Sequence, residues 1–166
     1  MNSILSNFFN FSKLLLVLLL FLTPNYGVFA DINKEPISIQ SDTLELNQEK
    51  GLATYLGKVL LTQNGKELRA DKIIIYRNTQ GKLEKILAFG NPAKYFGTLK
   101  NEHLLGEANK ITFLTGAQDM ILEGQAKLIQ KQDSFTAPYI TYNFQNKIIR
   151  SKAQEGIRPT IIFHPD

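Results

Sequence analysis

The sequence contains no cysteine and only two histidines among its 166 residues. Without cysteine, the chain can form no disulfide framework and carry no lipid-modified cysteine anchor. Neither His103 nor His164 has a second histidine or a carboxylate cluster at ligand spacing, so the sequence predicts no metal site. A domain without disulfides or a bound metal must be held together by an apolar core or by a long hydrogen-bonded sheet.

Arrangements that carry catalysis are also missing. No serine stands in a glycine-flanked nucleophile elbow, and there is no glycine-rich phosphate loop. Glu45 and Glu49 suit solvent-facing positions near a turn better than an acid–base pair. The sequence therefore predicts that the protein is not an enzyme and uses no cofactor.

Charge of one sign is not concentrated along the chain. After residue 30 there are 18 basic and 15 acidic residues, which gives a net charge of +3. The basic residues form no block and do not alternate with aromatic ones. This pattern argues against nucleic acid as a partner.

Residues 1–30 have the layout of a secretory signal peptide. One basic residue precedes an unbroken apolar run of nine, residues 14–22, and a Val-Phe-Ala tripeptide ends the segment at Ala30. Nine residues are well short of the ~20 that span a bilayer, although the apolar residues 8–11 could lengthen the run into an uncleaved anchor. We expect cleavage after Ala30 and one mature domain, residues 31–166.

One motif occurs four times in the rest of the sequence. In each copy a small residue is followed by Asp, Asn or Pro, and apolar residues stand two and four positions later. The copies begin at Ile39, Leu68, Gly106 and Phe135, at offsets of 29, 38 and 29 residues. A unit that recurs at this spacing indicates a repeat architecture.

Each copy of the motif predicts a strand, a corner and a second strand. Inward residues alternate with period two before the corner, as Leu68 and Ala70 do, and again after it, as Ile73 and Ile75 do. The spacing of three between Ala70 and Ile73 shifts the alternation by one residue, which a strand absorbs in a bulge or bend. Asp, Asn and Pro suit such a bend. Four corners would fold a sheet around an enclosed apolar space.

Turn signals separate short alternating runs throughout the chain. Asn64-Gly65 is a strong hairpin signal, and Gly57, Gly90 and Gly124 recur inside alternating runs, where glycine indicates a bulge or a close backbone approach. A looser connection is expected over residues 97–103. No segment after residue 30 has apolar residues at helical spacing over three turns, so the predicted class is all-β.

Two groups of residues allow a second interpretation. Asp42, Asp71 and Asn109 recur at matched positions, but a calcium site needs many oxygen ligands close together, so we interpret them as corner-forming residues. The inward aromatic residues are core residues by default, and the sequence leaves open whether they fill a solid core or line a groove: Tyr55, Tyr95, Phe113 and Tyr142.

These motifs, in this order, resemble the OstA family of periplasmic lipopolysaccharide-transport proteins. The resemblance runs from about Pro36 to Phe163. Four stretches carry it: Pro36-Ile37-Ser38-Ile39-Gln40-Ser41-Asp42, Tyr55-Leu56-Gly57-Lys58-Val59, Leu68-Arg69-Ala70-Asp71-Lys72-Ile73 and Ala88-Phe89-Gly90-Asn91-Pro92-Ala93.

The resemblance implies a twisted, open β-jellyroll with an apolar interior along its length. It also implies a periplasmic protein that carries lipopolysaccharide from the inner to the outer membrane, with the acyl chains of the lipid A moiety in that interior. The implied partners are an inner-membrane transporter complex with its anchored docking protein, an outer-membrane translocon, and further copies of the chain stacked head to tail. An apolar interior suits this cargo because each buried methylene contributes ~0.8 kcal/mol.

The resemblance also assigns residues to the groove. The positions that match the family's groove-facing positions are Ile37, Ile39, Tyr55, Val59, Leu61, Ile73, Ile75, Tyr95, Ile111, Phe113, Leu122, Leu128, Ile140 and Tyr142. Arg77 follows the second copy of the motif, where the family tends to place an arginine near its N-terminal edge.

The two ends of the repeat series are the expected assembly edges, because sequential elements of a sheet tend to be neighbours. Neither end run has a central lysine to guard it against pairing, and a contact between two different edges need not close. The edge residues, besides Arg77, are Pro36, Ile37, Ser38, Ile39 and Gln40 at one end, and Thr160, Ile161, Ile162 and Phe163 at the other.

The sequence leaves other functions open. The chain could be the membrane-anchored docking partner of the same superfamily, which would keep its N-terminal segment. It could also be a ligand-free structural β-repeat protein with a filled core. A glycosidase-like β-solenoid enzyme is disfavoured because the sequence has no carboxylate cluster.

Overall fold

The computed structural model describes residues 35–99, 102–154 and 156–165, and the expected signal peptide lies outside them. The described residues form ten strands and no helix, and none of them builds a helix long and apolar enough to cross a membrane. The strands are β1 (Ser38–Gln40), β2 (Thr43–Asn47), β3 (Leu52–Gln63), β4 (Lys66–Arg77), β5 (Leu83–Leu99), β6 (Glu102–Leu114), β7 (Asp119–Gln130), β8 (Asp133–Asn143), β9 (Ile149–Lys152) and β10 (Thr160–Ile162). The all-β prediction is confirmed.

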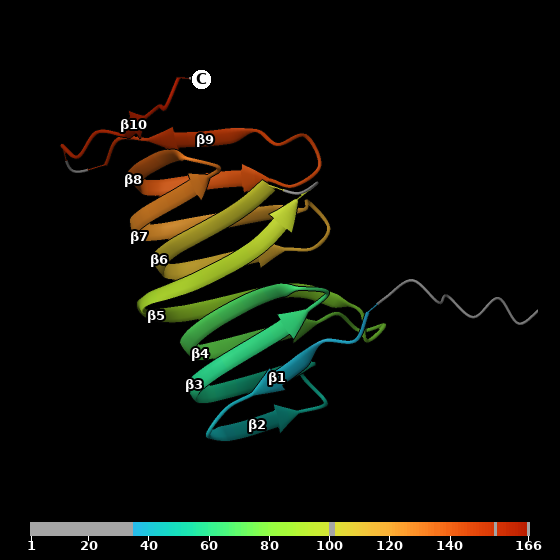
Figure 1. Cartoon of the computed structure of the whole chain (residues 1–166). Helices are drawn as coiled ribbons and strands as arrows, with labels where there is room; N and C mark the ends of the chain where they lie inside the picture. The colour runs from blue at the N-terminus through green and yellow to red at the C-terminus, as the bar shows by residue number, and fades with distance from the viewer. Residues whose placement is uncertain (1–34, 100–101, 155, 166) are drawn as a thin grey trace, which may run out of the picture. The chain divides into compact units, whose positions relative to one another are not determined.

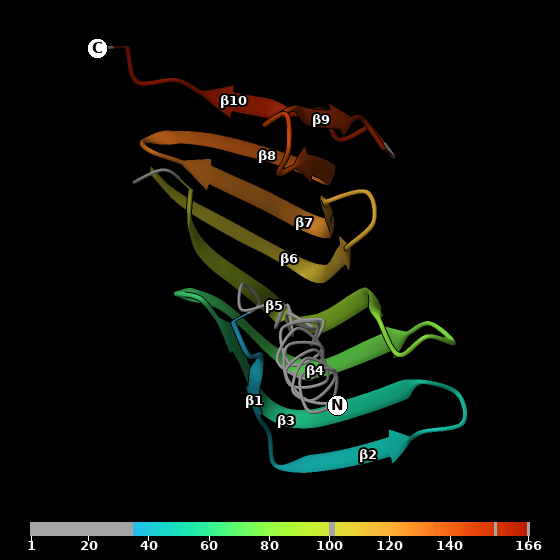
Figure 2. The ribbon, with the colours of Figure 1, turned by 90° about the vertical axis from the view of Figure 1, so that its right-hand side faces the viewer.

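The strands form one antiparallel sheet in the order β1-β3-β4-β5-β6-β7-β8-β10. The long strand β3 pairs with β1 over one part and with β2 over the other, and β8 pairs in the same way with β10 and β9. Each end of the sheet is therefore formed by two short strands. The ends do not pair with each other, so the sheet is open, and Figures 1 and 2 show the strands stacked from β2 to β10.

The predicted slip at the corners is present in every pairing of the long strands. The pairing of β3 with β4 shifts between Leu56 and Val59, and the later pairings shift at matching places. At the first corner Gly57 has φ +80, and a methyl group there would lie 2.2 Å from Asp42 Oδ2. Gly124 faces Asn109 in the same way. At these two corners the side chain of Asp42 or Asn109 thus packs on a glycine of the next strand.

The turns agree with the sequence in one place and differ in another. Asn64 and Gly65 both have positive φ, 48° and 70°, which fits the predicted tight hairpin between β3 and β4. The loose connection expected over residues 97–103 is wrong, because β5 continues to Leu99 and β6 begins at Glu102. The motif offset of 38 residues therefore reflects the 17-residue strand β5, since β3 and β7 each have 12 residues.

A single hydrophobic core collects buried side chains from β3 through β8. Ile73, Ile111, Met120, Leu122 and Ile140 are completely buried. Each such burial stabilises the fold by roughly 1.5–3 kcal/mol, so the core accounts for stability without disulfides or metals.

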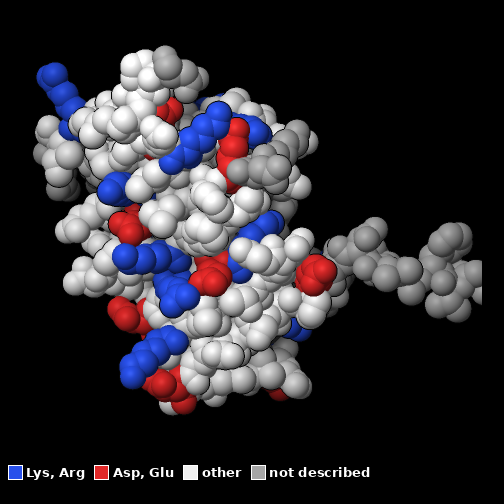
Figure 3. Space-filling view, in the orientation of Figure 1, with Lys and Arg blue, Asp and Glu red and all other residues white. Residues whose placement is uncertain are grey.

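The outer face of the sheet carries charges of both signs. Lys94 pairs with Glu107 at 3.0 Å and Lys110 with Glu123 at 2.7 Å, each across neighbouring strands. Figure 3 shows basic and acidic groups interspersed on the face in view. Such exposed pairs contribute little stability.

Candidate functional site in the apolar interior

Three cross-strand rows of side chains line the inner face of the sheet. The first is Ile39, Leu61, Leu68, Tyr95, Gly106, Leu128, Phe135 and Ile161. The second is Leu44, Tyr55, Ile73, Ala88, Ile111, Leu122, Ile140 and Ser151. The third is Leu46, Ala53, Ile75, Ile86, Phe113, Met120, Tyr142 and Ile149.

Each row runs from one end of the sheet to the other. Seven inter-strand spacings of about 4.8 Å make this inner face roughly 34 Å long. The second row ends on Ser151 at β9, and every other member of the three rows is apolar, aromatic or glycine. The register of the sheet therefore gives the interior a nearly continuous apolar lining.

The structure brings the fourteen predicted groove residues together. Twelve of them lie in the three rows. Val59 is buried where β3 pairs with Ala70, just past the corner. Ile37 precedes β1 and is 37% exposed, and it lies against the cavity described next.

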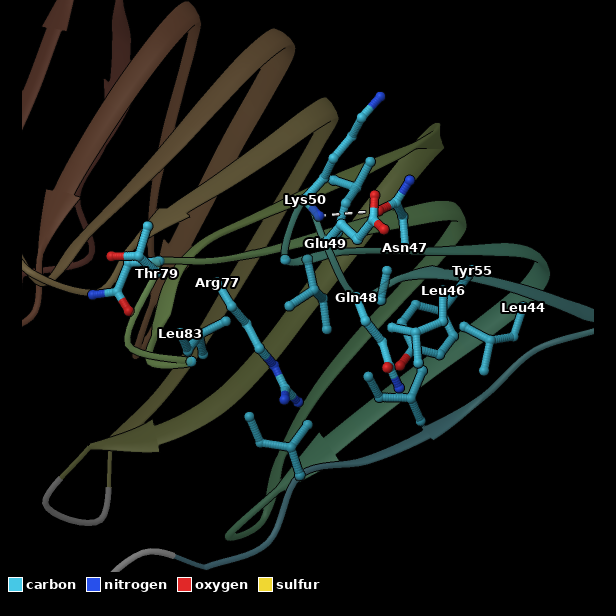
Figure 4. A pocket seen from close by; sticks show the side chains of 18 residues that line it. Leu44, Leu46, Asn47, Gln48, Glu49, Lys50, Tyr55, Arg77, Thr79 and Leu83 are labelled. Atoms are coloured by element: carbon cyan, nitrogen blue, oxygen red, sulfur yellow. Dashed lines mark hydrogen bonds between the residues drawn. The ribbon is translucent and has the colours of Figure 1, made fainter.

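A cavity of about 830 Å³ opens at the N-terminal end of the interior (Figure 4). Its apolar wall comes from the residue before β1, from β1, β2, β3 and β4, and from the first residue of β5: Ile37, Ile39, Leu44, Leu46, Leu52, Ala53, Tyr55, Ile75 and Leu83. Its polar rim comes from the last residues of β2 and β4 and from the turns that follow them, and it includes Asn47, Gln48 and Arg77. At this end the interior is a groove. The sequence had left open whether the inward residues fill a solid core or line a groove.

Four aromatic rings fill the interior farther along the sheet. The Phe144 ring lies 6.0 Å from Tyr95, 6.3 Å from Phe113 and 5.2 Å from Tyr142, measured between ring centroids. Tyr95 and Phe113 are 5.3 Å apart. Phe144 belongs to the turn after β8, where its backbone N–H donates to the carbonyl of Gln118 at 2.9 Å. The middle of the interior is therefore a packed core.

Two buried phenols of the interior carry no charge at neutral pH. Burial, and secondarily the neighbouring Tyr142, raises the pKa of Tyr95 to about 12. The pKa of Tyr142 is also raised, first by burial and then by the negative charge of Glu102. Both phenols therefore stay protonated. The Tyr142 hydroxyl is buried and has no hydrogen-bond partner among the residues that the structure describes.

The predicted edge residues lie at the two ends of the strand order, with one exception. Ser38, Ile39 and Gln40 form β1, Thr160, Ile161 and Ile162 form β10, and Pro36, Ile37 and Phe163 adjoin these strands. Ile161, Ile162 and Phe163 are half or more exposed. Arg77 differs from the expectation: it ends β4, which is paired on both sides, and it lines the cavity instead.

Some residues of this region were missed by the sequence analysis. Leu44 and Leu46 on β2 are 57% and 58% exposed at the end of the inner rows, and the repeat motif already marked them as inward. Strands β2 and β9 share the sheet ends with β1 and β10, although only the latter pair was expected. Phe144 had no signal, because it stands in a turn outside any alternating run.

The fold and the interior define a class of protein: an open β-jellyroll whose apolar interior opens at one end. Within the described part of the chain, no three His, Asp or Glu side chains gather where they could hold a metal ion.

Comparisons with known proteins agree with this class. A family model described as "LptA/(LptD N-terminal domain) LPS transport protein" matches residues 38–148. The lipopolysaccharide export system protein LptA of Haemophilus influenzae is 30% identical over 138 residues, which cover 81% of this chain and 80% of that protein. LptA of Escherichia coli is 28% identical over 145 residues, which cover 86% of this chain and 77% of that protein.

A solved structure is similar in fold. The crystal structure of LptH from Pseudomonas aeruginosa, described as the LptA-homologous periplasmic component of the lipopolysaccharide transport device, matches with a TM-score of 0.73. The match covers 79% of this chain and 96% of that chain, at 24% sequence identity. The chain belongs to the LptA/LptD N-terminal family of lipopolysaccharide-transport proteins. The resemblance seen in the sequence and the prediction of a non-enzymatic protein are thereby confirmed.

Proposed function

We propose that this protein carries lipopolysaccharide through the periplasm from the inner to the outer membrane, with the acyl chains of lipid A held against the inner face of the sheet. The observation that supports this most is the set of three apolar rows, which run through all the strands and end in an open cavity. Acyl chains that leave water for such a surface gain ~0.8 kcal/mol per methylene. A lining that is apolar from one end of the sheet to the other suits a carrier better than a closed storage pocket does.

Photo-crosslinking in cells tests the path. A photoreactive amino acid is placed at Ile39, Phe113 or Phe135, which lie on the inner face near the first end, in the middle and near the second end. Gln40 and Thr136 are the controls, because each is exposed and stands next to an inward residue. We expect lipopolysaccharide adducts at the three inner positions and not at the controls. Adducts of equal strength at all five positions would contradict an inner path, and a ligand-free structural protein would give none.

The mature protein in this proposal starts at Asp31, after cleavage behind Ala30, and consists of the single domain 31–166. The alternative is the membrane-anchored docking partner of the same superfamily, which would keep residues 1–30. The intact mass of protein purified from the cell envelope separates the two. A chain that begins at Met1 and stays with the inner membrane would support the anchored alternative.

Assembly in this proposal uses the two sheet ends. Strands β1 and β2 run antiparallel to β9 and β10, so the antiparallel alternation would continue if β9 and β10 of one copy paired with β2 and β1 of the next. The same ends would bind an anchored docking protein of the inner-membrane transporter and an outer-membrane translocon. Pairing of exposed strands is a common mode of recognition.

The register suggests how two copies are aligned. Glu45 on β2 and Arg150 on β9 terminate the same outward-facing cross-strand row, which passes through Thr54, Ile74, Leu87, Thr112, Ile121 and Thr141. If this row continues between copies, Glu45 of one copy faces Arg150 of the next. Opposite charges directly across a strand pair contribute roughly 0.2–1 kcal/mol, and like charges oppose pairing.

A charge swap tests this alignment. In sedimentation experiments Glu45→Lys should weaken assembly, Arg150→Glu should do the same, and the double variant should restore it. Glu49→Lys makes the same change of charge in the turn after β2, outside the row, and should have little effect. If the double variant assembles no better than either single variant, the proposed register is wrong.

A further inference from the structure

We infer that the N-terminal cavity recognises an amphiphile with an anionic headgroup, and that the guanidinium of Arg77 binds a phosphate or carboxylate of that headgroup while an acyl chain lies on the apolar wall. This inference rests on the proposed function and adds a charged contact to it. It also gives Arg77 a role at the cavity in place of the role at an assembly edge.

The backbone of Arg77 is fixed at the mouth of the cavity. Its N–H donates to the carbonyl oxygen of Gly51 at 2.8 Å. Gly51 has φ +61, and a methyl group there would lie 2.5 Å from the carbonyl oxygen of Arg77, so only glycine allows this close approach. The turn after β2 thus holds the end of β4, and the arginine side chain starts from a defined place.

The side chain of Arg77 has no acidic partner in the part of the chain that the structure describes. The ion pairs found there join Arg69 with Glu67 and three lysines with three other glutamates. Figure 4 shows the Arg77 side chain extending from the end of β4 between Leu83 and Gln48, which also line the cavity. An arginine remains charged under all ordinary conditions, so a cation without a counter-charge faces the cavity.

The other charged groups of the lining do not neutralise this cation. Glu49 and Lys50 belong to the turn after β2, beside Asn47, and the Lys50 side chain points away from the cavity in Figure 4. The backbone N–H of Lys50 donates to Asn47 Oδ1 at 3.0 Å, which anchors that turn. Arg77 is therefore the cation that an occupant of the cavity would meet.

The chemistry of the lining selects the class of ligand. A guanidinium forms its strongest contacts with phosphate and carboxylate, often through two parallel hydrogen bonds. Leu46, Tyr55 and Leu83 offer a neighbouring apolar surface. A molecule that satisfies both needs an acid group attached to an acyl chain, as a phosphorylated glycolipid has. A small free anion would use only the exposed guanidinium and would bind weakly.

Binding of two matched lipids tests the inference on the mature protein. The probes are bis-phosphorylated lipid A and the same lipid without its phosphates, presented in identical neutral detergent micelles. We expect the parent to bind the phosphorylated lipid at least about tenfold more tightly. Arg77→Gln should lose this preference and bind both lipids as the parent binds the dephosphorylated one. Arg77→Lys should keep part of the preference, because lysine retains the positive charge but cannot form the two parallel hydrogen bonds of a guanidinium.

The controls separate this inference from the proposed function. Lys50→Gln removes a rim cation that points away and should leave the preference unchanged. Millimolar inorganic phosphate should not displace the lipid, and displacement would reduce the site to a simple anion site and overturn the inference. An Arg77→Gln variant that keeps the parental preference would overturn it as well. If the parent binds neither lipid, the proposed function itself fails.

Discussion

The outer end of the cavity allows a sharp test of inward and outward positions on one strand. Leu46 and Thr43 both lie on β2, and both are exposed. Leu46 pairs with Ala53 on the inner face and lines the cavity, whereas Thr43 pairs with Leu56 on the outer face. Leu46→Asp and Thr43→Asp put the same charge on the same strand, so effects on net charge and on edge pairing are shared by the two variants.

The expected difference follows from the exposure of Leu46. Complete burial of a leucine side chain contributes about 1.5–3 kcal/mol. Leu46 is 58% exposed in the free protein, so an acyl chain can cover somewhat more than half of it. Loss of that contact, about 1–1.7 kcal/mol, adds to the cost of desolvating a carboxylate, at least ~1 kcal/mol. A total of about 2 kcal/mol corresponds to roughly thirtyfold weaker binding.

Lipid binding and unfolding are measured together. Displacement of a fluorescent acyl probe by lipid A should show the thirtyfold loss for Leu46→Asp and little change for Thr43→Asp. Both positions are exposed, so both variants should unfold in urea within ~0.5 kcal/mol of the parent. If the two variants bind lipid within threefold of each other, the assignment of the inner face on β2 is wrong.

Three further predictions concern stability. Tyr142→Phe removes a buried hydroxyl that has no partner within the described residues. Urea unfolding should therefore show no loss of stability and a gain of up to ~1 kcal/mol, whereas a clear loss would mean that the hydroxyl is hydrogen-bonded. The pKa of Tyr95 is raised from 10.0 to about 12, so the folded state holds the phenol proton more tightly than the unfolded state does. The stability that results is complete below pH 10 and is lost between pH 10 and 12. Unfolding measured at pH 9, 10 and 11 should therefore decline less steeply for Tyr95→Phe. Gly57→Ala should lower the free energy of unfolding by at least ~2 kcal/mol, because the φ of Gly57 is +80 and the added methyl group would contact Asp42. Adding Asp42→Ala should recover only the part of the loss that comes from this contact, and a double-mutant cycle measures that part.

The corners and the inner face could be predicted because local chemistry determines them. The three-residue spacing between Ala70 and Ile73 required a slip, and the pairing of β4 with β5 shifts between Arg69 and Lys72. The glycines inside the alternating runs are explained by the same corners. At one of them Gly57 leaves room for the side chain of Asp42. These features depend on neighbours in the chain and on one adjacent strand.

The shape of the interior could not be predicted in the same way. Alternation tells which side chains point inward but not how far apart the two halves of a bent sheet lie. That distance depends on Phe144, a turn residue that enters the interior between three rings from β5, β6 and β8. The outer face of the sheet is not exposed throughout either: Thr112 lies on it but is only 6% exposed, between Leu87 and Ile121.

The position of the cavity connects lipid binding with assembly. Its wall includes β1 and β2, the strands that pair with a neighbouring copy in the proposed stack. Continued rows would bring Ile161 of the neighbour beside Ile39, and Ile149 beside Leu46. The neighbour would then cover the exposed end of the cavity and complete its apolar wall. A lipid that binds more tightly in the completed cavity must, by linkage, favour stacking by the same factor. Saturating lipid A should therefore increase head-to-tail assembly of the parent protein, and it should have much less effect on Leu46→Asp.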